Sequence, residues 1–212
     1  MDGLLFDSER IVQRSWEIAG DELGIPHMGD VIYHTLGMNR AGRNEYFRKY
    51  IREDFPFEEF GKLTRDNFWK IVDKEGLPLK KGAKELLAYG KSQGYKMAVA
   101  TSSSREYAMG NLIRAGIDSY FDSVVCGDMV KKAKPDPEIY QKACESLGIQ
   151  PENCMAFEDA PGGIRSAYQA GMYPVMIPDL VKPENEVRKL AYQVLDSLED
   201  VIELLEKNSL WR

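Results

Sequence analysis

Long hydrophobic runs and an excess of positive charge are both absent from this sequence of 212 residues. No stretch approaches the ~18 consecutive apolar residues of a membrane span, and the first residues lack the basic start and apolar core of a signal peptide. Lys and Arg number 28 against 34 Asp and Glu, a net charge of −6 that argues against a nucleic-acid-binding protein. We therefore expect a cytoplasmic protein with no membrane or nucleic-acid partner, although this charge is compatible with a small anionic substrate.

Cysteine and histidine are scarce. The three cysteines, Cys126, Cys144 and Cys154, form no Cys-x-x-Cys pair and have no neighbouring His, so we predict neither a zinc site nor a disulfide framework. We expect them to be small buried hydrophobic side chains in a reducing compartment. His27 and His34 are the only histidines, and neither is near a nucleophile signature. We interpret both as surface or packing residues, which argues against Ser-His-Asp or Cys-His catalysis.

The first third of the chain is patterned for helices. Apolar residues such as Ile11 and Trp16 recur near helical spacing, and no convincing alternating segment precedes Gly76. Glycine and proline in residues 76–79 end this pattern at an expected hinge. The sequence therefore predicts an all-helical unit over residues 11–76.

The rest of the chain alternates short apolar segments with amphipathic helices. The expected strands are Met97–Ala100, Ser123–Cys126, Met155–Phe157 and Pro174–Ile177. The expected helices cover roughly residues 83–93, 105–115, 137–147, 163–170 and 198–207. Strands that alternate with helices indicate βαβ crossovers, and hence an α/β fold with a parallel sheet covered on both faces. In such sheets, functional groups lie just beyond the carboxyl ends of the strands.

Polar clusters begin the chain and follow the expected strands, at residues 2–9, 101–104, 134–137 and 158–159. Carboxylates hold Mg²⁺, while hydroxyl and ammonium groups bind phosphoryl oxygens, so these clusters contain the groups that metal-assisted phosphoryl chemistry needs. Each cluster alone has a simpler interpretation as a helix cap, a solvated turn or an exposed lysine. Their occurrence together in this order favours a phosphoryl-transfer site.

These motifs resemble those of haloacid dehalogenase superfamily phosphatases, in the branch similar to β-phosphoglucomutase. Asp2-Gly3 matches the second half of the first motif, Asp-x-Asp-Gly, and Thr101 matches the hydroxyl residue of the second. Lys134 matches the lysine of the third motif, and Glu158-Asp159 matches the acidic pair of the fourth. The resemblance covers nearly the whole chain.

The resemblance also implies the domain organisation. It predicts a Rossmann-like parallel sheet core over residues 1–10 and 77–212, with an all-helical cap inserted over residues 11–76. The Gly-x-x-Arg loop of the cap matches Gly37-Met38-Asn39-Arg40. Arg40 would bind a second anionic or hydroxyl group of the substrate with its planar guanidinium group.

The resemblance gives chemical roles to the matched residues of the core. Asp2 would be the general acid/base, with its backbone carbonyl on Mg²⁺. Asp159 would be a metal ligand, and Glu158 a neighbouring ligand or a group that supports the ligands. The phosphoryl group would be bound by three residues, Thr101, Ser102 and Lys134, of which Lys134 would also neutralise the carboxylates.

Three positions depart from the family pattern. Val12 occupies the position of the catalytic His of the mutase, which favours hydrolysis over phosphoryl transfer between sugar hydroxyls. Ala133 replaces the glycine that usually precedes the lysine. The nucleophile of the family is the first Asp of Asp-x-Asp-Gly, and here x is Met1. The resemblance therefore implies that the position of the nucleophile, and the central strand that leads to it, precede the sequence. We expect that Met1 is internal to an Asp-Met-Asp-Gly motif, and that without this strand the core is marginally stable or fills the gap with another strand.

The leading hypothesis is a monomeric, Mg²⁺-dependent phosphatase that hydrolyses a phosphate monoester on a small metabolite, such as a sugar phosphate, through an aspartyl-phosphate intermediate. One alternative is a sugar phosphomutase of the same family. Another is an inactive phosphate-binding relative without the nucleophile. A true dehalogenase is disfavoured, because that branch lacks the acid matched by Asp2. Substrate choice would depend on cap side chains such as Arg40, His34, Asn39 and Trp69.

Overall fold

The computed structural model describes residues 1–35, 40–179 and 184–207, with only the backbone at residues 40 and 41. The chain divides into two compact units. The helical unit is Asp7–Leu77, and the α/β unit is Met1–Phe6 together with Pro78–Arg212. Among the described residues, every helix is too short or too polar to span a membrane.

The described residues of the helical unit form four helices, α1 (Ser8–Glu22), α2 (Met28–Thr35), α3 (Arg40–Tyr50) and α4 (Phe57–Glu75). Helix α1 packs against both α2 and α4. The apolar spacing of the sequence buries Trp16, whose ring meets Phe47 and Phe60 edge-on at centroid distances of 5.5 and 5.6 Å. Such edge-to-face contacts fix the mutual orientation of aromatic rings, so they specify how these helices pack.

The α/β unit alternates strands and helices as the sequence predicts. Its helices are α5 (Ala83–Ser92), α6 (Arg105–Arg114), α7 (Glu138–Leu147), α8 (Pro161–Gln169), α9 (Asn185–Leu190) and α10 (Glu199–Lys207). Its strands are β1 (Ala98–Ala100), β2 (Ser123–Val125), β3 (Met155–Glu158), β4 (Tyr173–Met176) and β5 (Gln193–Val194). Three short 3-10 helices are also present, η1 (Asp118–Tyr120), η2 (Gly127–Met129) and η3 (Pro151–Asn153). Helix α9 and strand β5 were not predicted.

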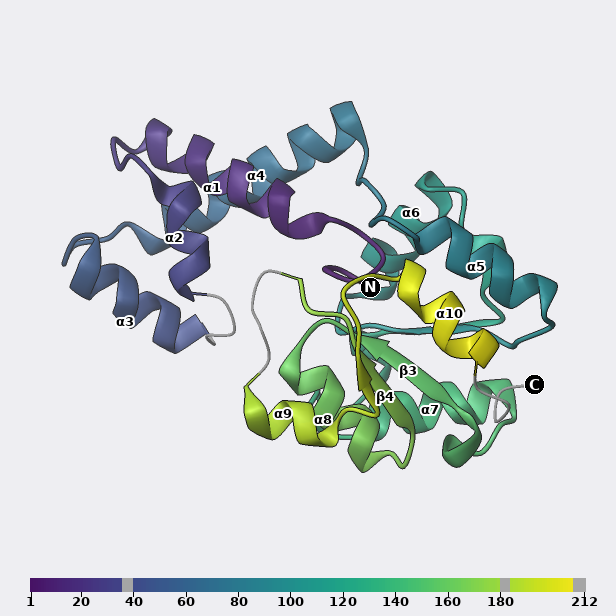
Figure 1. The fold of residues 1–212 in the computed structure, drawn as a ribbon. Coiled ribbons are helices and arrows are strands. Elements are labelled where there is room, and N and C mark those ends of the chain that lie inside the picture. The colour runs from purple at the N-terminus through teal and green to yellow at the C-terminus, as the bar shows by residue number, and fades with distance from the viewer. Residues whose placement is uncertain (36–39, 180–183, 208–212) are drawn as a thin grey trace. The chain divides into compact units, whose positions relative to one another are not determined.

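All strand pairs of the described sheets are parallel, which confirms the predicted α/β class. The strands form two sheets, one with the order β1-β2 and one with the order β3-β4-β5. Helices α7 and α8 pack on these strands, and α10 packs against α5. Figure 1 shows α10 and α7 on opposite sides of β3.

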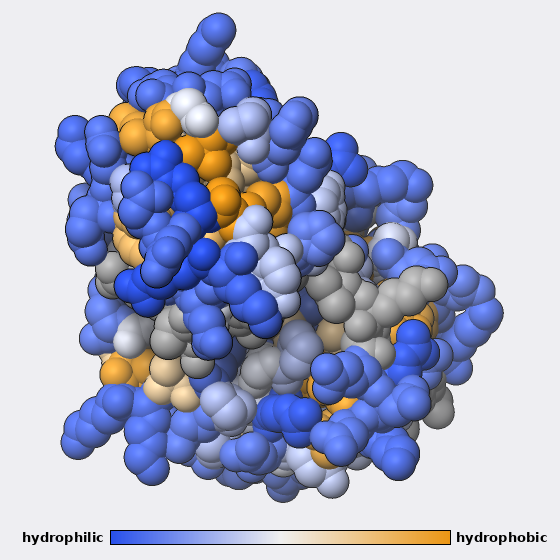
Figure 2. Space-filling model, turned by 90° about the vertical axis from the view of Figure 1, so that its left-hand side faces the viewer, coloured by the Kyte–Doolittle hydropathy of each residue, from blue (hydrophilic) through white to orange (hydrophobic). Residues whose placement is uncertain are grey.

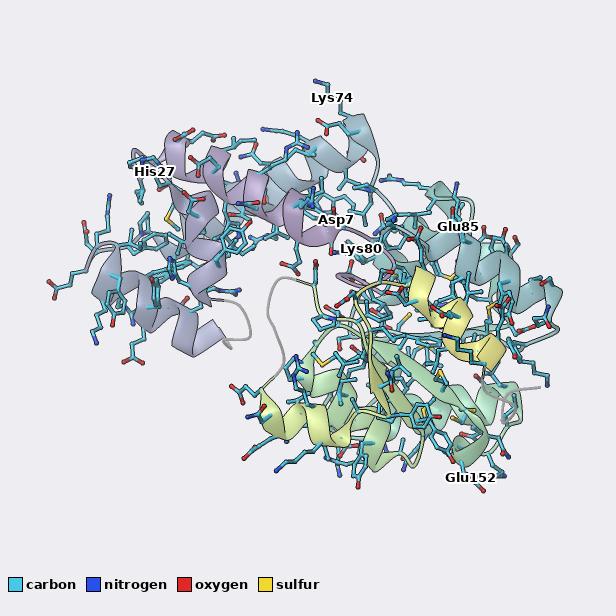
Figure 3. The ribbon with its side chains drawn as sticks, viewed as in Figure 1. Asp7, His27, Lys74, Lys80, Glu85 and Glu152 are labelled. Atoms are coloured by element: carbon cyan, nitrogen blue, oxygen red, sulfur yellow. The ribbon has the colours of Figure 1, made fainter. Side chains whose placement is uncertain are left out.

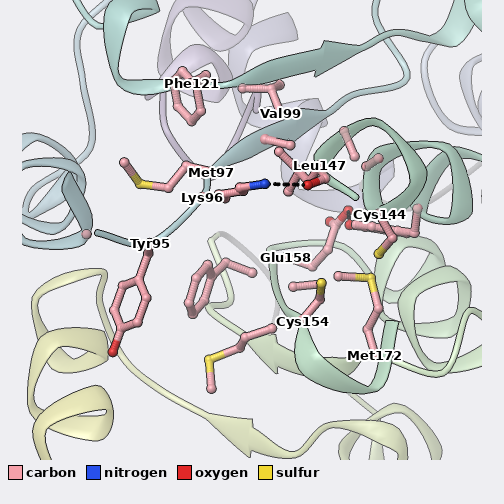
Figure 4. Close-up of a pocket in the computed structure, with 18 of the residues that line it drawn as sticks. Tyr95, Lys96, Met97, Val99, Phe121, Cys144, Leu147, Cys154, Glu158 and Met172 are labelled. Carbon is pink, nitrogen blue, oxygen red and sulfur yellow. Dashed lines mark hydrogen bonds between the residues drawn. The ribbon is translucent and has the colours of Figure 1, made fainter. Parts of the chain in front are cut away.

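A cavity of about 280 Å³ separates the two sheets and is lined along the length of both β1 and β3 (Figure 4). Its other lining residues are mostly apolar and come from α5, α7, α10 and the first five residues of the chain. The described residues include no strand that pairs with both β1 and β3. Within the described residues, no other segment of the chain occupies this space between β1 and β3.

The backbone hydrogen bonds show that the two facing strand edges are open. Met97 O accepts a hydrogen bond from Asp122 N, and Thr101 N donates one to Val125 O, so the backbone groups of these two residues face β2. Backbone groups of successive residues in a strand point to alternate sides, so those of Ala98 point away from β2. In β3 the same alternation directs the backbone groups of Met155 and Phe157 away from β4. The cavity therefore lies beside two rows of strand donors and acceptors, which a further strand would pair with.

Most of the surface visible in Figure 2 is hydrophilic, interrupted by smaller hydrophobic patches. This agrees with the 29% of charged residues in the sequence. Isolated apolar residues on a surface are ordinary, so these patches by themselves indicate no partner.

Candidate active site

Asp2 is held in a tight turn at the start of the α/β unit. The backbone N–H groups of Leu4, Leu5 and Phe6 all point at Met1 O, and that of Leu5 lies 2.8 Å from it. Gly3 has a φ of +72°, a conformation that favours glycine. The turn presents the Asp2 carboxylate to two hydroxyl groups.

Those hydroxyl groups belong to Ser103 and Tyr107. The Ser103 hydroxyl donates to Asp2 Oδ2 at 2.9 Å, and the Tyr107 hydroxyl donates to Asp2 Oδ1 at 3.0 Å. Both carboxylate oxygens are thereby bound, so the orientation of Asp2 is fixed by the loop after β1 and by helix α6. Neither Ser103 nor Tyr107 was predicted as a site residue.

The turn that bears Asp2 is also anchored at Leu5, on its C-terminal side. The N–H group of Lys80 donates to Leu5 O at 2.8 Å, and the Lys80 ammonium group forms an ion pair with Asp179. Figure 3 labels Lys80 in this part of the α/β unit. The segment that bears Asp2 is thus connected to residues before α5 and after β4.

The predicted phosphate-binding hydroxyls follow β1. Thr101 is buried, its N–H group donates to Val125 O at 3.0 Å, and its Oγ1 accepts from the N–H group of Ser103 at 3.2 Å. Ser102 is exposed, and Ser104 is the N-cap of α6, where its side chain accepts from the N–H group of Tyr107. The run of hydroxyl residues therefore both caps a helix and leaves Ser102 free to contact solvent or a ligand.

Lys134 joins the ends of β1 and β3. Its ammonium group donates to Ala100 O at 3.1 Å and to Glu158 Oε1 at 2.5 Å, and it lies 4.8 Å from the centre of the Tyr140 ring. The side chains of Lys134 and Glu158 are only 13% and 8% exposed. Burial makes an unpaired charge costly, so each of these two charges depends on the other.

Glu158 is also bound by Tyr140. The hydroxyl group of Tyr140, a residue of helix α7, donates a hydrogen bond to Glu158 Oε1 at 2.5 Å. Burial of Glu158 by itself would raise its pKa, but the charges of Lys134 and the amino terminus and the hydrogen bonds together hold that pKa below its ordinary value. Burial and the charge of Glu158 raise the pKa of Tyr140 well above its usual range, so the hydroxyl stays a donor.

The carboxylate of Asp159 lies directly against Gly3. A Cβ atom on Gly3 would come within 2.3 Å of Asp159 Oδ2, so only glycine allows this approach to the backbone next to Asp2. This places the Asp159 carboxylate, a type of ligand that Mg²⁺ prefers, beside the residue that follows Asp2. Within the described ranges no group of three or more His, Cys, Asp or Glu side chains is arranged to hold a metal. The predicted ligands Asp2, Asp159 and Glu158 are therefore not arranged as such a group, and Glu158 is instead bound by Lys134 and Tyr140. Their carboxylates are nevertheless the type of ligand that Mg²⁺ prefers.

The remaining predicted residues belong to the helical unit. The backbone of Arg40 begins α3, but its side chain and the Gly37-Met38-Asn39 segment lie outside the described part of the structure. His27 is exposed, and His34 is exposed and stacks on Tyr46 at a centroid distance of 6.1 Å. Figure 3 labels His27 on the helical unit.

Comparison with protein families identifies the class of this fold and site. The model of the haloacid dehalogenase-like hydrolases matches residues 1–171. The chain belongs to this hydrolase family, which confirms the resemblance drawn from its motifs.

Individual relatives agree with this assignment. The phosphorylated carbohydrates phosphatase of Thermotoga maritima is 33% identical over 172 residues, which are 81% of this chain and 79% of the relative. The crystal structure of a HAD family hydrolase from Deinococcus radiodurans with bound phosphate and sodium has a TM-score of 0.82 and 25% identity, covering 97% of this chain and 93% of that one. The β-phosphoglucomutase of Clostridium difficile covers 97% of this chain and 92% of its own with a TM-score of 0.69, and at 23% identity shows the fold alone.

Proposed function

We propose that this chain hydrolyses a phosphate monoester on a small phosphorylated carbohydrate, with Mg²⁺ as its cofactor and an aspartyl-phosphate intermediate. The observation that supports this most strongly is the gathering of Asp2, Thr101, Lys134 and Glu158 within one hydrogen-bonded region of the α/β unit. Their backbone positions come from four separate segments of the sequence, so their proximity is a property of the fold and not of any one motif.

In the proposed reaction Asp2 moves the proton. As an acid it protonates the leaving oxygen of the substrate, and as a base it then takes a proton from the water that attacks the aspartyl phosphate. Ser103 and Tyr107 hold its two carboxylate oxygens in place before the substrate arrives. The resemblance assigns the nucleophile to an aspartate immediately before Met1, so the scheme applies to a chain with that residue.

Thr101, Ser102 and Lys134 are the proposed phosphate-binding residues. The Lys134 ammonium group is already placed by Ala100 O and Glu158, so it loses little conformational freedom when it binds phosphoryl oxygens. Asp159 and the carbonyl of Asp2 would hold Mg²⁺, with Glu158 close by. Bound there, the ion would neutralise charge on the phosphoryl oxygens.

The proposed substrate class comes from the relatives. The Thermotoga maritima relative is named for phosphorylated carbohydrates, and the small polar substrate it implies suits the predicted role of Arg40. A guanidinium group binds a second phosphate or vicinal hydroxyls through two parallel hydrogen bonds.

The test uses a chain that is extended before Met1 by an apolar strand ending in aspartate. The assay measures the Mg²⁺-dependent release of inorganic phosphate from a panel of sugar phosphates. The same extension ending in asparagine is the control. Lys134→Ala should lower kcat/KM by about 10²–10³-fold, the usual loss for one donor to a developing charge. Lys132→Ala is the matched control, because Lys132 is an exposed lysine two residues away.

Equal turnover by the aspartate and asparagine chains would refute the aspartyl-phosphate mechanism. Equal effects of Lys134→Ala and Lys132→Ala would refute the assignment of the phosphate site. Product analysis separates hydrolysis from the mutase alternative, since a mutase would yield an isomeric sugar phosphate in place of inorganic phosphate.

A further inference from the structure

Two hydroxyl groups distinguish the two carboxylate oxygens of Asp2. The Ser103 hydroxyl donates to Oδ2 at 2.9 Å from the loop after β1, and the Tyr107 hydroxyl donates to Oδ1 at 3.0 Å from the first turn of α6. The terminal torsion of an aspartate side chain is broad, so the oxygens of an unrestrained carboxylate interchange by rotation. The two hydrogen bonds give each oxygen of Asp2 a different neighbour and hold it there.

The loop that bears Ser103 is fixed against the chain that follows β2. Ser103 O accepts from the N–H group of Gly127 at 2.9 Å, and the N–H group of Ser103 donates to Thr101 Oγ1 at 3.2 Å. A Cβ atom on Gly127 would come within 2.2 Å of Ser102 O, so only glycine allows this approach. The donor to Oδ2 therefore belongs to the same fixed loop as Thr101 and Ser102, the proposed phosphate-binding residues.

Tyr107 is fixed by helix α6. The helix begins after Ser104, whose side chain accepts from the N–H group of Tyr107. The next N–H group, that of Arg105, donates to Asp128 Oδ2 at 3.0 Å. The side-chain amide of the buried Asn111 donates to Tyr107 O at 3.0 Å. A hydroxyl group on a rigid ring, carried by a capped helix, can hold its partner in one place.

We propose that Tyr107 is a positioning residue that holds Oδ1 of Asp2, which leaves Oδ2 as the oxygen that transfers the proton. Oδ2 lies on the side of Ser103 and hence of the phosphate-binding loop, whereas Oδ1 lies on the side of α6. The inference rests on the proposed function, which gives Asp2 the acid and base role but does not say which oxygen performs it.

Oδ2 carries one proton through the reaction. As the P–O bond to the leaving group breaks, the proton on Oδ2 moves to the leaving oxygen, and the phosphoryl group bonds to the aspartate before Met1. The Tyr107 hydroxyl still donates to Oδ1 and so stabilises the carboxylate that remains. Oδ2 then takes a proton from the water that releases the phosphate, which restores the starting state.

The proton matters most for a leaving group that is a poor anion. Phenyl phosphate and 4-nitrophenyl phosphate share the same ring, but nitrophenolate departs readily without a proton and phenolate does not. Phosphate binding is common to both substrates, so loss of a phosphate contact lowers kcat/KM equally for both. Because kcat/KM covers the steps up to departure of the leaving group, the ratio of the two values reports proton transfer by Asp2.

The kinetic experiment uses the chain extended before Met1 by an apolar strand ending in aspartate. We expect Tyr107→Phe to lower kcat/KM for phenyl phosphate by about 10–100-fold and to leave that for 4-nitrophenyl phosphate nearly unchanged. Tyr168→Phe is the matched control, because it removes a hydroxyl group from an exposed tyrosine of α8 and should change neither value. Ser103→Ala should change the ratio less than Tyr107→Phe, because Oδ2 must leave Ser103 to reach the substrate.

A second measurement needs no turnover and uses the 212-residue chain itself. In NMR spectra, the three-bond couplings between Hα and Hβ of Asp2 report how many side-chain rotamers are populated. We expect one rotamer in the parent chain, in Tyr168→Phe and in Ser103→Ala, and averaged couplings in Tyr107→Phe. Circular dichroism of each variant shows whether the chain is folded.

Equal losses of kcat/KM for the two aryl phosphates in Tyr107→Phe would overturn the inference, as would a larger change of the ratio in Ser103→Ala. A single Asp2 rotamer in Tyr107→Phe would also overturn it. If Tyr107→Phe does not fold, the parent chain and Ser103→Ala still decide, because averaged couplings in either contradict the role of Tyr107. An extended parent chain without turnover contradicts the proposed function instead, and the couplings then test the positioning of Asp2 by themselves.

Discussion

Removal of the Tyr140 hydroxyl tests how much the buried contact with Glu158 contributes to stability. In Tyr140→Phe the ring is retained, so its packing and its contact with the Lys134 ammonium group persist. The 2.5 Å hydrogen bond to Glu158 Oε1 is lost, together with the 3.4 Å hydrogen bond that the Tyr140 hydroxyl accepts from the Lys134 ammonium group, in a region where Tyr140 and Glu158 are buried. Hydrogen bonds to charged groups contribute about 1.5–3 kcal/mol, so we expect the free energy of unfolding to fall by that amount.

The assay is urea unfolding followed by far-ultraviolet circular dichroism. The midpoint should fall while the slope stays unchanged, and in a chain of this size Tm should fall by about 3–12 °C. Tyr168→Phe is the control, because it makes the same chemical change at a tyrosine of α8 that is 53% exposed, and it should alter stability by less than about 0.5 kcal/mol. Equal losses in the two variants, or a loss below about 0.5 kcal/mol for Tyr140→Phe, would refute the reasoning.

Three further predictions concern the site and the sheet. In a chain with aspartate before Met1, Asp159→Asn should abolish Mg²⁺-dependent turnover, because an amide replaces an anionic ligand; unchanged Mg²⁺ affinity would contradict the assignment. Arg40→Ala should raise KM for a phosphorylated carbohydrate far more than for a small aryl phosphate, and equal effects would show that Arg40 does not select the substrate. Fusion of an apolar strand to Met1 should raise the urea midpoint, because each buried apolar side chain adds ~1.5–3 kcal/mol, and an unchanged midpoint would show that the strand does not enter the cavity.

The α/β class could be predicted because apolar segments and amphipathic helices alternate over the second part of the chain. Each predicted strand agrees with the structure to within one residue at either end. Strand β5 was missed because a strand of two residues, Gln193–Val194, has no detectable alternation. Its pairing depends on β4, which is a tertiary contact. The same holds for α9, whose six residues are too few for a clear helical period.

Most of the predicted core residues lie just after expected strands, a position that the sequence reveals, whereas Arg40 was predicted only from the resemblance. Tyr107 and Tyr140 were missed because they lie within helices, where the sequence shows which residues are apolar but not which hydroxyl faces a carboxylate. Ser103 lies in the polar cluster at residues 101–104, yet only the fold shows that its hydroxyl binds Asp2.

The cavity between β1 and β3 also determines how the α/β unit responds to compression. Unfolding removes the unfilled volume of about 280 Å³ between the two strands and so reduces the total volume of the system. Hydrostatic pressure favours the state of smaller volume and therefore favours unfolding here. Any side chain or strand that occupies the cavity would make the folded chain less compressible, whatever hydrogen bonds it formed.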